Sequence, residues 1–495
     1  MAETPVEIPS ALIHALPGRP PASRGIFCNR TLNLRSIQAI GYDLDYTLVH
    51  YNVITWERRA YEHLRDQLAA DGWPVERLEF DPDLIIRGLV VDTALGNIVK
   101  ANRFGYVKRA YHGMQPLNFE TLRREYSRLP VDLTESRWVF LNTLFSLSKG
   151  CMYSQLVEKL DAHELPAGIG YAELYNRVTT SLDRVHQQGH LKAEIVAHPD
   201  DFVELDPEMP LALLDQREAG KRVLLITNSD WDYTSAMARY TFDRFLPGKM
   251  TWKDLFDLVI VSARKPAFFT GGAPAFEVMS ADGMCQPCRD GIEKPGCYVG
   301  GHAALVERFL GHDQDEILYI GDHVFGDVHQ SKSVRRWRTG LIARELEPEI
   351  EAINGFREHQ EQLTKLMERK DQLGFRLSQH RLLLQRLDSG RLQVPGLGKS
   401  VVHTELKRLR AEFDALDGAI VPHVKVAGGL MNRRWGLLMR TGNDKSLMAR
   451  HVERHADIYT SRVSNFLYET PHAYLRSSRG SLPHDPIPDV MLEGE

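Results

Sequence analysis

Two aspartates separated by one residue, Asp43 and Asp45, are the side chains in this sequence best suited to chemistry. They follow a short apolar run, residues 37–42, so a strand there would carry both carboxylates out at its carboxyl end. One carboxylate can act as a nucleophile while the other moves a proton as general acid and base. Carboxylates this close repel each other unless a cation joins them, and Mg²⁺ suits carboxylates together with phosphate oxygens. The pair therefore indicates metal-assisted phosphoryl chemistry.

Three later apolar runs have the same form, each followed at once by polar residues. They cover residues 222–226, 257–261 and 316–320, and they lead to Thr227, Lys265 and Asp322. Short continuous apolar runs separated by helical patterns predict a parallel sheet in an α/β fold. Ligands bind outside the carboxyl ends of such strands, so the four sites should converge, with Asp322 completing the metal site. Any one of these residues alone could be a turn or helix-cap residue, but four at equivalent positions favour a site.

The strands that must position these residues are separated in the sequence by a long insertion. About 175 residues separate Thr47 from the second run, too many for one crossover connection. We therefore expect a Rossmann-like core over residues 31–50 and 205–345, with an inserted cap or substrate domain over 51–204. An irregular arm over 1–30, a helical region over 346–480 and a tail over 481–495 complete the division. Apolar residues at helical spacing in 349–386 predict long helices forming an αα-hairpin, and a coiled coil is less favoured because the heptads look interrupted.

Composition limits the class of protein. The 495 residues carry 61 Lys and Arg against 66 Asp and Glu, a net charge of −5, and 43% are hydrophobic. These values exclude a disordered chain and argue against nucleic-acid binding through overall positive charge. No apolar stretch is long enough to span a bilayer, and the first residues do not look like a secretory signal. Five cysteines fit a reducing compartment, so we expect a cytoplasmic protein without nucleic-acid or membrane partners.

The ordered motifs resemble those of a known superfamily. Asp43-x-Asp45-x-Thr47, the Thr227 strand end, Lys265 and the segment from Gly321 to Asp327 are similar to the four motifs of the haloacid-dehalogenase superfamily of phosphatases. The longer strings around them resemble the cytosolic purine 5′-nucleotidases that prefer IMP and GMP. This resemblance implies a core like that of the superfamily, Mg²⁺ as cofactor, hydrolysis of purine nucleoside 5′-monophosphates and a homodimer or homotetramer.

The resemblance also implies roles for the motif residues. Asp43 would attack phosphorus to give an aspartyl-phosphate, and Asp45 would protonate the leaving oxygen and later activate water. Thr227 and Lys265 would hold the phosphoryl oxygens, where a fixed positive charge stabilises the transferring group. Mg²⁺ would bind Asp43, the backbone carbonyl of Asp45, and Asp322, while Asp327 would support the site by orienting Lys265 or a metal-bound water. A nucleoside in place of water would make the enzyme a phosphotransferase.

Substrate and effector contacts follow from the same resemblance. The residues it assigns to the substrate are Asn142, Phe145, Asp183, His186, Lys192, Asn228 and Ser229. Phe145 would stack on a purine, and His186 or Lys192 would bond an oxo group at its six position, although each alone could equally be an ordinary core or surface residue. Thr179 stands where the family has an arginine, which affects the preference among GMP, IMP and AMP. Phe325, Arg454 and Asn142 match positions of a nucleotide effector site, whereas Ser333 replaces a family lysine.

Other interpretations stay open. Cys285, Cys288, Cys297 and His302 could form a zinc site, although free thiols are favoured because a second Cys-x-x-Cys is lacking. The basic residues from Lys332 to Arg338 could attract an anion or simply form a solvated helix face. A phosphatase for another small ester, such as a phosphosugar, is the alternative enzyme. A non-catalytic scaffold that binds nucleotide or protein partners is the alternative of another class.

Overall fold

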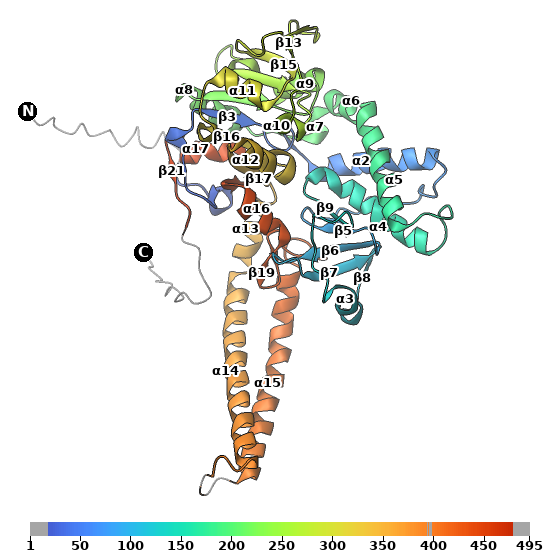
Figure 1. The fold of residues 1–495 in the computed structure, drawn as a ribbon, viewed down its shortest axis with the longest axis vertical. Helices are drawn as coiled ribbons and strands as arrows, with labels where there is room; N and C mark the ends of the chain where they lie inside the picture. The colour runs from blue at the N-terminus through green and yellow to red at the C-terminus, as the bar shows by residue number, and fades with distance from the viewer. Residues whose placement is uncertain (1–17, 394, 396–397, 479–495) are drawn as a thin grey trace, which may run out of the picture. The chain divides into compact units, whose positions relative to one another are not determined.

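The computed structural model describes residues 18–393, 395 and 398–478 (Figure 1). The chain forms two compact units. The first contains residues up to Asn52, Lys192–Arg344 and the chain from His451 onward, and the second contains Val53–Leu191 and Glu345–Arg450. Among the helices of the described part, none is long and apolar enough to cross a membrane.

The first unit is built on a ten-stranded sheet whose middle strands are the predicted apolar runs. In spatial order the strands are β1 (Phe27–Cys28), β20 (Ile458–Thr460), β17 (Arg338–Ile342), β16 (Ile317–Gly321), β3 (Ala39–Tyr42), β11 (Arg222–Ile226), β12 (Leu258–Val261), β15 (Gly296–Gly300), β13 (Ala275–Val278) and β14 (Cys285–Pro287). From β20 to β15 all neighbours are parallel, and antiparallel strands add to both edges. The expected Rossmann-like α/β class is confirmed.

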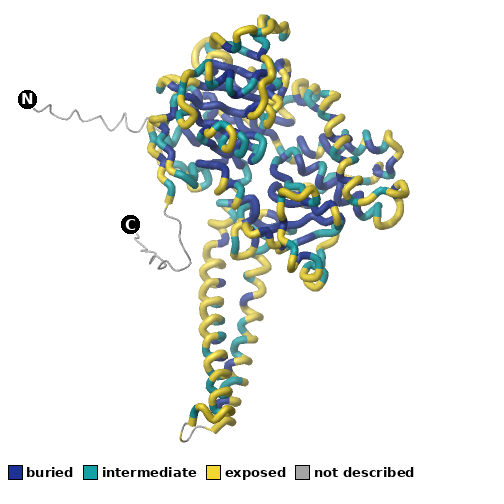
Figure 2. The backbone as a smooth tube through the Cα atoms, viewed as in Figure 1, coloured by how far each residue is buried: buried dark blue, intermediate teal, exposed yellow. Residues whose placement is uncertain are grey.

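Helices and short paired strands complete the first unit. Its helices are α7 (Pro199–Phe202), α8 (Met209–Glu218), α9 (Trp231–Phe242), α10 (Ala267–Thr270), α11 (Ala303–Leu310), α12 (Gln330–Arg335) and α17 (Phe466–Glu469), together with α6 (His190–Ala197) and α16 (Leu447–His455), whose first residues belong to the second unit. Two small antiparallel pairs are β4 (His50–Tyr51) with β10 (Val203–Glu204), and β2 (Leu32–Asn33) with β21 (Tyr474–Leu475). The strands β3, β11, β12 and β16 are buried along almost their whole length, as strands covered on both faces must be (Figure 2).

The second unit has its own antiparallel sheet. Its strand order is β8 (Gln115–Pro116), β7 (Val107–His112), β6 (Asn97–Ala101), β5 (Val90–Asp92) and β9 (Trp138–Phe140). The accompanying helices are α2 (Val53–Ala70), α3 (Phe119–Tyr126), α4 (Leu147–Asp161), α5 (Tyr171–Gln188) and α13 (Leu346–Gly355), and a small hairpin joins β18 (Arg440–Thr441) to β19 (Asp444–Lys445). Buried residues of the sheet, among them Val90, Val99 and Trp138, form one apolar cluster with Leu447.

The long helices of the second unit form a helical hairpin. α14 (Arg357–Asp388) and α15 (Lys399–Gly428) lie side by side along their length (Figure 1). Most residues of α14 that are withdrawn from solvent follow spacings of three and four over several heptads, namely Leu363, Leu366, Lys370, Leu373, Leu377, His380, Leu384 and Leu387, and Gly374, Arg376 and Leu383 flank this row. This corrects the expectation that heptads are not sustained, and the hairpin has coiled-coil spacing. Lys370 and His380 obscure the pattern in the sequence because they are polar. Lys370 bonds Asp417 and lies over the Phe413 ring, and His380 bonds a backbone carbonyl.

The boundaries of the two compact units differ from the helical region expected over residues 346–480. Residues 345–450 group with the inserted chain, while Ile458–Thr460 forms a strand inside the main sheet, between β1 and β17. The two strands that pair with Ile458–Thr460 belong to the first unit. The helical pattern of the surrounding sequence gave no sign of this strand. The expected arm over 1–30 lies partly outside the described residues, and the tail over 481–495 lies wholly outside them. The five-part division remains a prediction.

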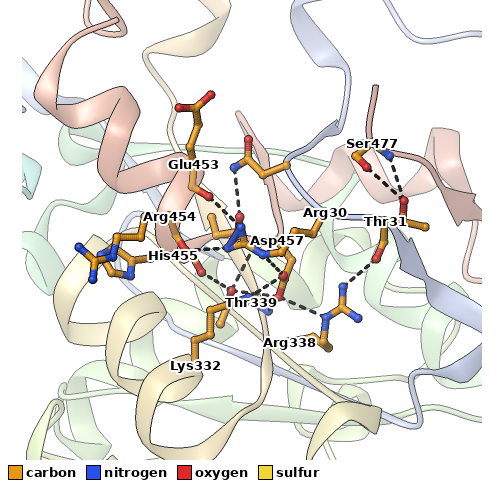
Figure 3. Close-up of polar contacts among 12 residues, drawn as sticks. Arg30, Thr31, Lys332, Arg338, Thr339, Glu453, Arg454, His455, Asp457 and Ser477 are labelled. Carbon is orange, nitrogen blue, oxygen red and sulfur yellow. Dashed lines mark hydrogen bonds and ion pairs between the residues drawn. The ribbon is translucent and has the colours of Figure 1, made fainter. Parts of the chain in front are cut away.

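A buried carboxylate joins three distant stretches of the first unit (Figure 3). Asp457 is 1% exposed, and it accepts bonds from Arg30, Lys332 and Arg338 as well as from the Thr339 backbone. Burial opposes the charged form of Asp457, but the bonded Lys332 and the nearby Arg338 bring its pKa below its ordinary value. The basic cluster noted in the sequence thus has two members, Lys332 and Arg338, in a structural network.

Candidate active site

The carboxyl ends of four neighbouring strands carry the predicted catalytic residues. Tyr42 of β3 is paired with Leu225 of β11 on one side and with Ile320 of β16 on the other. β12 continues the sheet beyond β11. Because all four strands are parallel, the segments that follow them leave the sheet at the same edge. Asp43, Thr227, Lys265 and Asp322 are therefore brought to one edge from a 280-residue span of sequence.

Lys265 is the centre of this site. Its Nζ lies 2.7 Å from Asp43 Oδ1 and 2.8 Å from Asp327 Oδ1, and it donates to the Tyr319 hydroxyl at 3.0 Å. The Lys265 side chain is 4% exposed. Burial disfavours the ammonium, but Asp327 and Asp43 hold the pKa of Lys265 well above its ordinary value. Lys265 is thus a fixed positive charge beside the carboxylate proposed as nucleophile.

Three carboxylates gather around this lysine. Asp43, Asp322 and Asp327 each offer an oxygen, and these oxygens all lie within 4.8 Å of one another. Asp327 can approach because residue 321 is glycine: a Cβ there would lie 2.5 Å from the Asp327 carboxyl group. When all three carboxylates are ionised, they exceed the one ammonium by two negative charges. Hard oxygen ligands with this charge fit Mg²⁺.

The nucleophile candidate has a perturbed acidity. Burial raises the pKa of Asp43 to about 7, Lys265 opposes the rise, and the charge of Asp327 adds to it. Asp43 also accepts a hydrogen bond from the backbone N–H of Leu44 at 2.8 Å through Oδ1, the oxygen that Lys265 contacts. A carboxylate that is costly to ionise in isolation gains most from a neighbouring cation.

Asp45 is held by hydroxyl groups rather than by cations. Its Oδ1 accepts a bond from the Tyr51 hydroxyl at 2.6 Å, and its Oδ2 accepts one from Ser229 Oγ at 2.6 Å. Lys192 Nζ donates to Ser229 Oγ at 3.0 Å and lies 4.6 Å from the centre of the Tyr233 ring. Ser229 and Lys192, expected to contact substrate, are therefore assembled around Asp45.

The residues after β11 brace the site. Thr227 is buried, and its Oγ1 accepts a bond from the Ser229 N–H at 3.1 Å. Asn228 is exposed, but its side-chain amide bonds both backbone groups of Lys265, at 2.6 Å to the N–H and 3.1 Å to the carbonyl. Asn228 thus fixes the loop that carries Lys265, and its expected contact with substrate remains a prediction.

Four of the residues expected to contact the substrate lie in the second unit, whereas Lys192 lies in the first. Asn142 is 9% exposed, and Phe145 is half-buried with its ring edge against Trp56 at 5.4 Å. Asp183 is exposed on α5, and His186 lies in the last turn of that helix. Their contact with a base remains a prediction.

The expected effector residues lie beside a group of histidines. The Phe325 ring is 5.1 Å from that of His451, and His455 lies 4.4 Å from His329. Burial lowers the pKa of His455 to about 3, with the neighbouring histidines adding to the effect. Arg454 presents its backbone carbonyl to Arg30. An effector contact at Phe325 and Arg454 remains a prediction.

The zinc interpretation gains no support from the geometry. Cys285 pairs with Val278 on β13, and Cys297 pairs with Val259 on β12, so different neighbours surround them. Within the described chain, the aspartate group is the only set of three or more metal-type side chains that converges. The five cysteines form no disulfide bonds with one another.

Sequence reasoning missed three tyrosines. Tyr319 bonds Lys265 and the Ile226 carbonyl, while Tyr51 and Tyr233 bond each other beside Asp45. Tyr319 lies in the fourth motif string, and Tyr51 follows the Asp43-x-Asp45 motif closely. The place of Tyr319 inside a motif string was the available signal, but an apolar strand hides a tyrosine whose hydroxyl bonds a site residue.

Known proteins resemble this chain over most of its length. A model described as "5' nucleotidase family" matches residues 26–487. A 5′-nucleotidase domain-containing protein of Dictyostelium discoideum is 27% identical over 93% of this chain and 74% of its own length. The human 5′-nucleotidase domain-containing protein 2 is 27% identical over 89% of this chain and 81% of its own length.

A crystal structure of CbbY from Rhodobacter sphaeroides in complex with xylulose-(1,5)bisphosphate is similar at 14% identity, over 62% of this chain and 86% of that one, with a TM-score of 0.24.

Proposed function

The chain belongs to the 5′-nucleotidase family and is a phosphoric monoester hydrolase of that kind; from this premise we propose that it hydrolyses purine nucleoside 5′-monophosphates with Mg²⁺, preferring the 6-oxopurines IMP and GMP. One observation carries the chemical part of the proposal. The Lys265 ammonium lies 2.7 Å from Asp43, beside two further carboxylates. A nucleophile, a fixed cation and a cation-binding carboxylate set are the groups that phosphoryl transfer through an aspartate requires.

The residues divide the reaction into two steps. In the first, an oxygen of Asp43 bonds to phosphorus and the bond to the ribose 5′-oxygen breaks, while Asp45 gives its proton to that oxygen. In the second, Asp45 takes a proton from water, water attacks phosphorus, and the Asp43 carboxylate leaves. Lys265 and Thr227 stabilise the phosphoryl oxygens throughout. Bound Mg²⁺, held by Asp43, Asp322 and the Asp45 carbonyl, would neutralise charge on the phosphoryl group.

The finer parts of the proposal rest on the resemblance of sequence segments. Those segments support base recognition by Asn142, Phe145, Asp183 and His186, and an effector contact at Phe325 and Arg454. Because the covalent phosphoryl group waits for an acceptor, we also propose transfer to a nucleoside when one replaces water. A homo-oligomer and a cytoplasmic location complete the proposal.

A substrate panel tests it. Phosphate release is measured for IMP, GMP, AMP, pyrimidine nucleotides and phosphosugars, with Mg²⁺ or with chelator, and with or without ATP. The proposal predicts the largest kcat/KM for IMP or GMP and no turnover in chelator. Faster turnover of a phosphosugar would replace the nucleotide assignment.

A further inference from the structure

The carboxylate of Asp45 is bonded on both oxygens by hydroxyl groups of the first unit. Tyr51 bonds Oδ1 and Ser229 bonds Oδ2, each at 2.6 Å. The two partners come from different elements, because Tyr51 ends β4 and Ser229 precedes α9. A carboxylate bonded from two directions cannot rotate without losing one of the bonds. The contacts thus fix the plane of the carboxylate.

A second layer holds the two hydroxyl groups. The Tyr233 hydroxyl lies 2.9 Å from that of Tyr51, and the Lys192 ammonium donates to Ser229 Oγ at 3.0 Å. Tyr51 is 2% exposed, Tyr233 is 3% exposed and Ser229 is 2% exposed. Lysine can only donate, so a serine oxygen that accepts from Lys192 directs its own proton toward Asp45. Lys192 therefore sets the direction of the Ser229 bond.

Asp45 needs such support because its backbone is in a tight turn. The next residue, Tyr46, has φ of 56°, and Asp45 itself is only partly buried. General acid catalysis requires the proton donor within hydrogen-bond reach of the leaving oxygen, and small displacements of catalytic groups are costly. A short side chain on a turn keeps that geometry when neighbouring side chains hold it.

We infer that Tyr51 and Tyr233, with Lys192 acting through Ser229, are positioning residues that hold Asp45 in line with the leaving oxygen. This inference rests on the proposed role of Asp45 as acid and base. Lys192 would then act on the catalytic acid rather than on the base of the substrate.

The test compares leaving groups. A nucleoside or other alkyl alcohol leaves only with a proton, whereas 4-nitrophenolate leaves readily without one. We expect Tyr51→Phe to lower the phosphorylation rate with the alkyl ester about 10- to 100-fold, a fraction of the usual contribution of a general acid. KM should change less than about threefold, because substrate binding is not the function of this residue. The burst of 4-nitrophenolate from 4-nitrophenyl phosphate should slow less than about threefold, since no general acid is needed.

Further variants separate positioning from structural support. Tyr233→Phe should show the same leaving-group pattern at smaller size, and Tyr51→Phe with Ser229→Ala should be less than additive because both orient one carboxylate. Tyr240→Phe is the matched control. Tyr240 lies on α9, as Tyr233 does, and the substitution removes the hydrogen bond from its hydroxyl to Asp200. Its rates should equal those of the wild type.

Equal losses with both leaving groups, or no loss in Tyr51→Phe, would overturn the inference. The alkyl ester is whichever monoester the wild-type enzyme hydrolyses fastest in the substrate panel. If nucleotides are not substrates, the proposed function fails while this test still stands.

Discussion

Asp43 and Lys265 form an ion pair in which each side chain controls the charge of the other. The lysine is nearly buried between two carboxylates, so its charge is fixed, while Asp43 has a raised pKa. Such perturbed acid groups in a converging set are typical of active sites. Two predictions about single residues follow from this pair.

The first of these concerns the nucleophile. Asp43→Asn keeps the size of the side chain but removes the attacking oxygen, so we expect turnover to fall by at least about 10⁴-fold, as for other enzymes that lose a nucleophile. Phosphate release measures the loss, and an unchanged circular dichroism spectrum confirms folding. Full activity in this variant would reject the assignment of Asp43.

The second concerns proton competition at the cation site. A carboxyl group with a pKa of about 7 is protonated below that pH, and a proton on Asp43 must leave before a cation binds. We therefore expect the Mg²⁺ dissociation constant to rise toward about tenfold per pH unit below about 7 and to flatten above it. Calorimetric titration between pH 5.5 and 8 measures this slope. An affinity that is constant across that range would contradict it.

At the scale of elements, the apolar pattern of the α14 sequence differs from the face of α14 that is withdrawn from solvent. The withdrawn face of α14 contains Lys370 and His380 among its leucines. Each polar group finds a partner in place, Lys370 across the hairpin and His380 one turn back, so the heptad continues where composition alone suggests a break. Only the facing helix shows that these positions belong to the seam.

The hairpin gives a stability prediction. Leu373 is fully buried between the helices, so Leu373→Ala should lower the stability of the hairpin by about 2–5 kcal/mol through lost burial and a cavity. Hydrogen exchange of the α14 and α15 amides measures the effect. Leu382→Ala on the same helix is the control, because Leu382 is 43% exposed and its truncation should change exchange little. Equal exchange in both variants would show that the seam is not packed as described.

At the scale of the whole molecule, the first unit depends on stretches from both ends of the described chain. β1 and β20 are neighbours in the main sheet, and Asp457 joins Arg30 near β1 to Lys332 and Arg338. This network is absent until residues more than 400 positions apart have met. Loss of its centre should therefore affect the fold of the unit.

Asp457→Asn tests that dependence. Three cationic side chains would lose a buried counter-charge, so we expect about 3 kcal/mol less stability and a lower Tm at pH 7. The pKa of Asp457 is lower in the folded state than its ordinary value. Asp457 therefore adds to the free energy of unfolding above its ordinary pKa, and this stabilisation is lost as pH falls through the folded-state pKa. The Tm difference from wild type should thus shrink below about pH 4, as calorimetry at several pH values would show.

Asp388→Asn is the control for that variant, since its pair with Lys399 is 55% and 56% exposed and exposed pairs contribute little. A Tm for Asp457→Asn no lower than that of Asp388→Asn would contradict a central role for the network.

The sequence by itself determined the strand core and the order of the chemical groups. Continuous apolar runs such as 222–226 form strands wherever both faces are covered, and the polar residues that follow them are fixed by chain direction. These features depend on local pattern, which is why β3, β11, β12 and β16 could be predicted.

Tertiary structure alone decided which side chains meet. It set the Lys265 ammonium between Asp43 and Asp327, placed Lys192 beside Ser229, and brought Tyr51 and Tyr233 to Asp45. It also added β20 to the main sheet and grouped residues 345–450 with the inserted chain. Hydrogen bonds and ion pairs act over a few ångströms between residues far apart in sequence, so spacing along the chain carries no record of them.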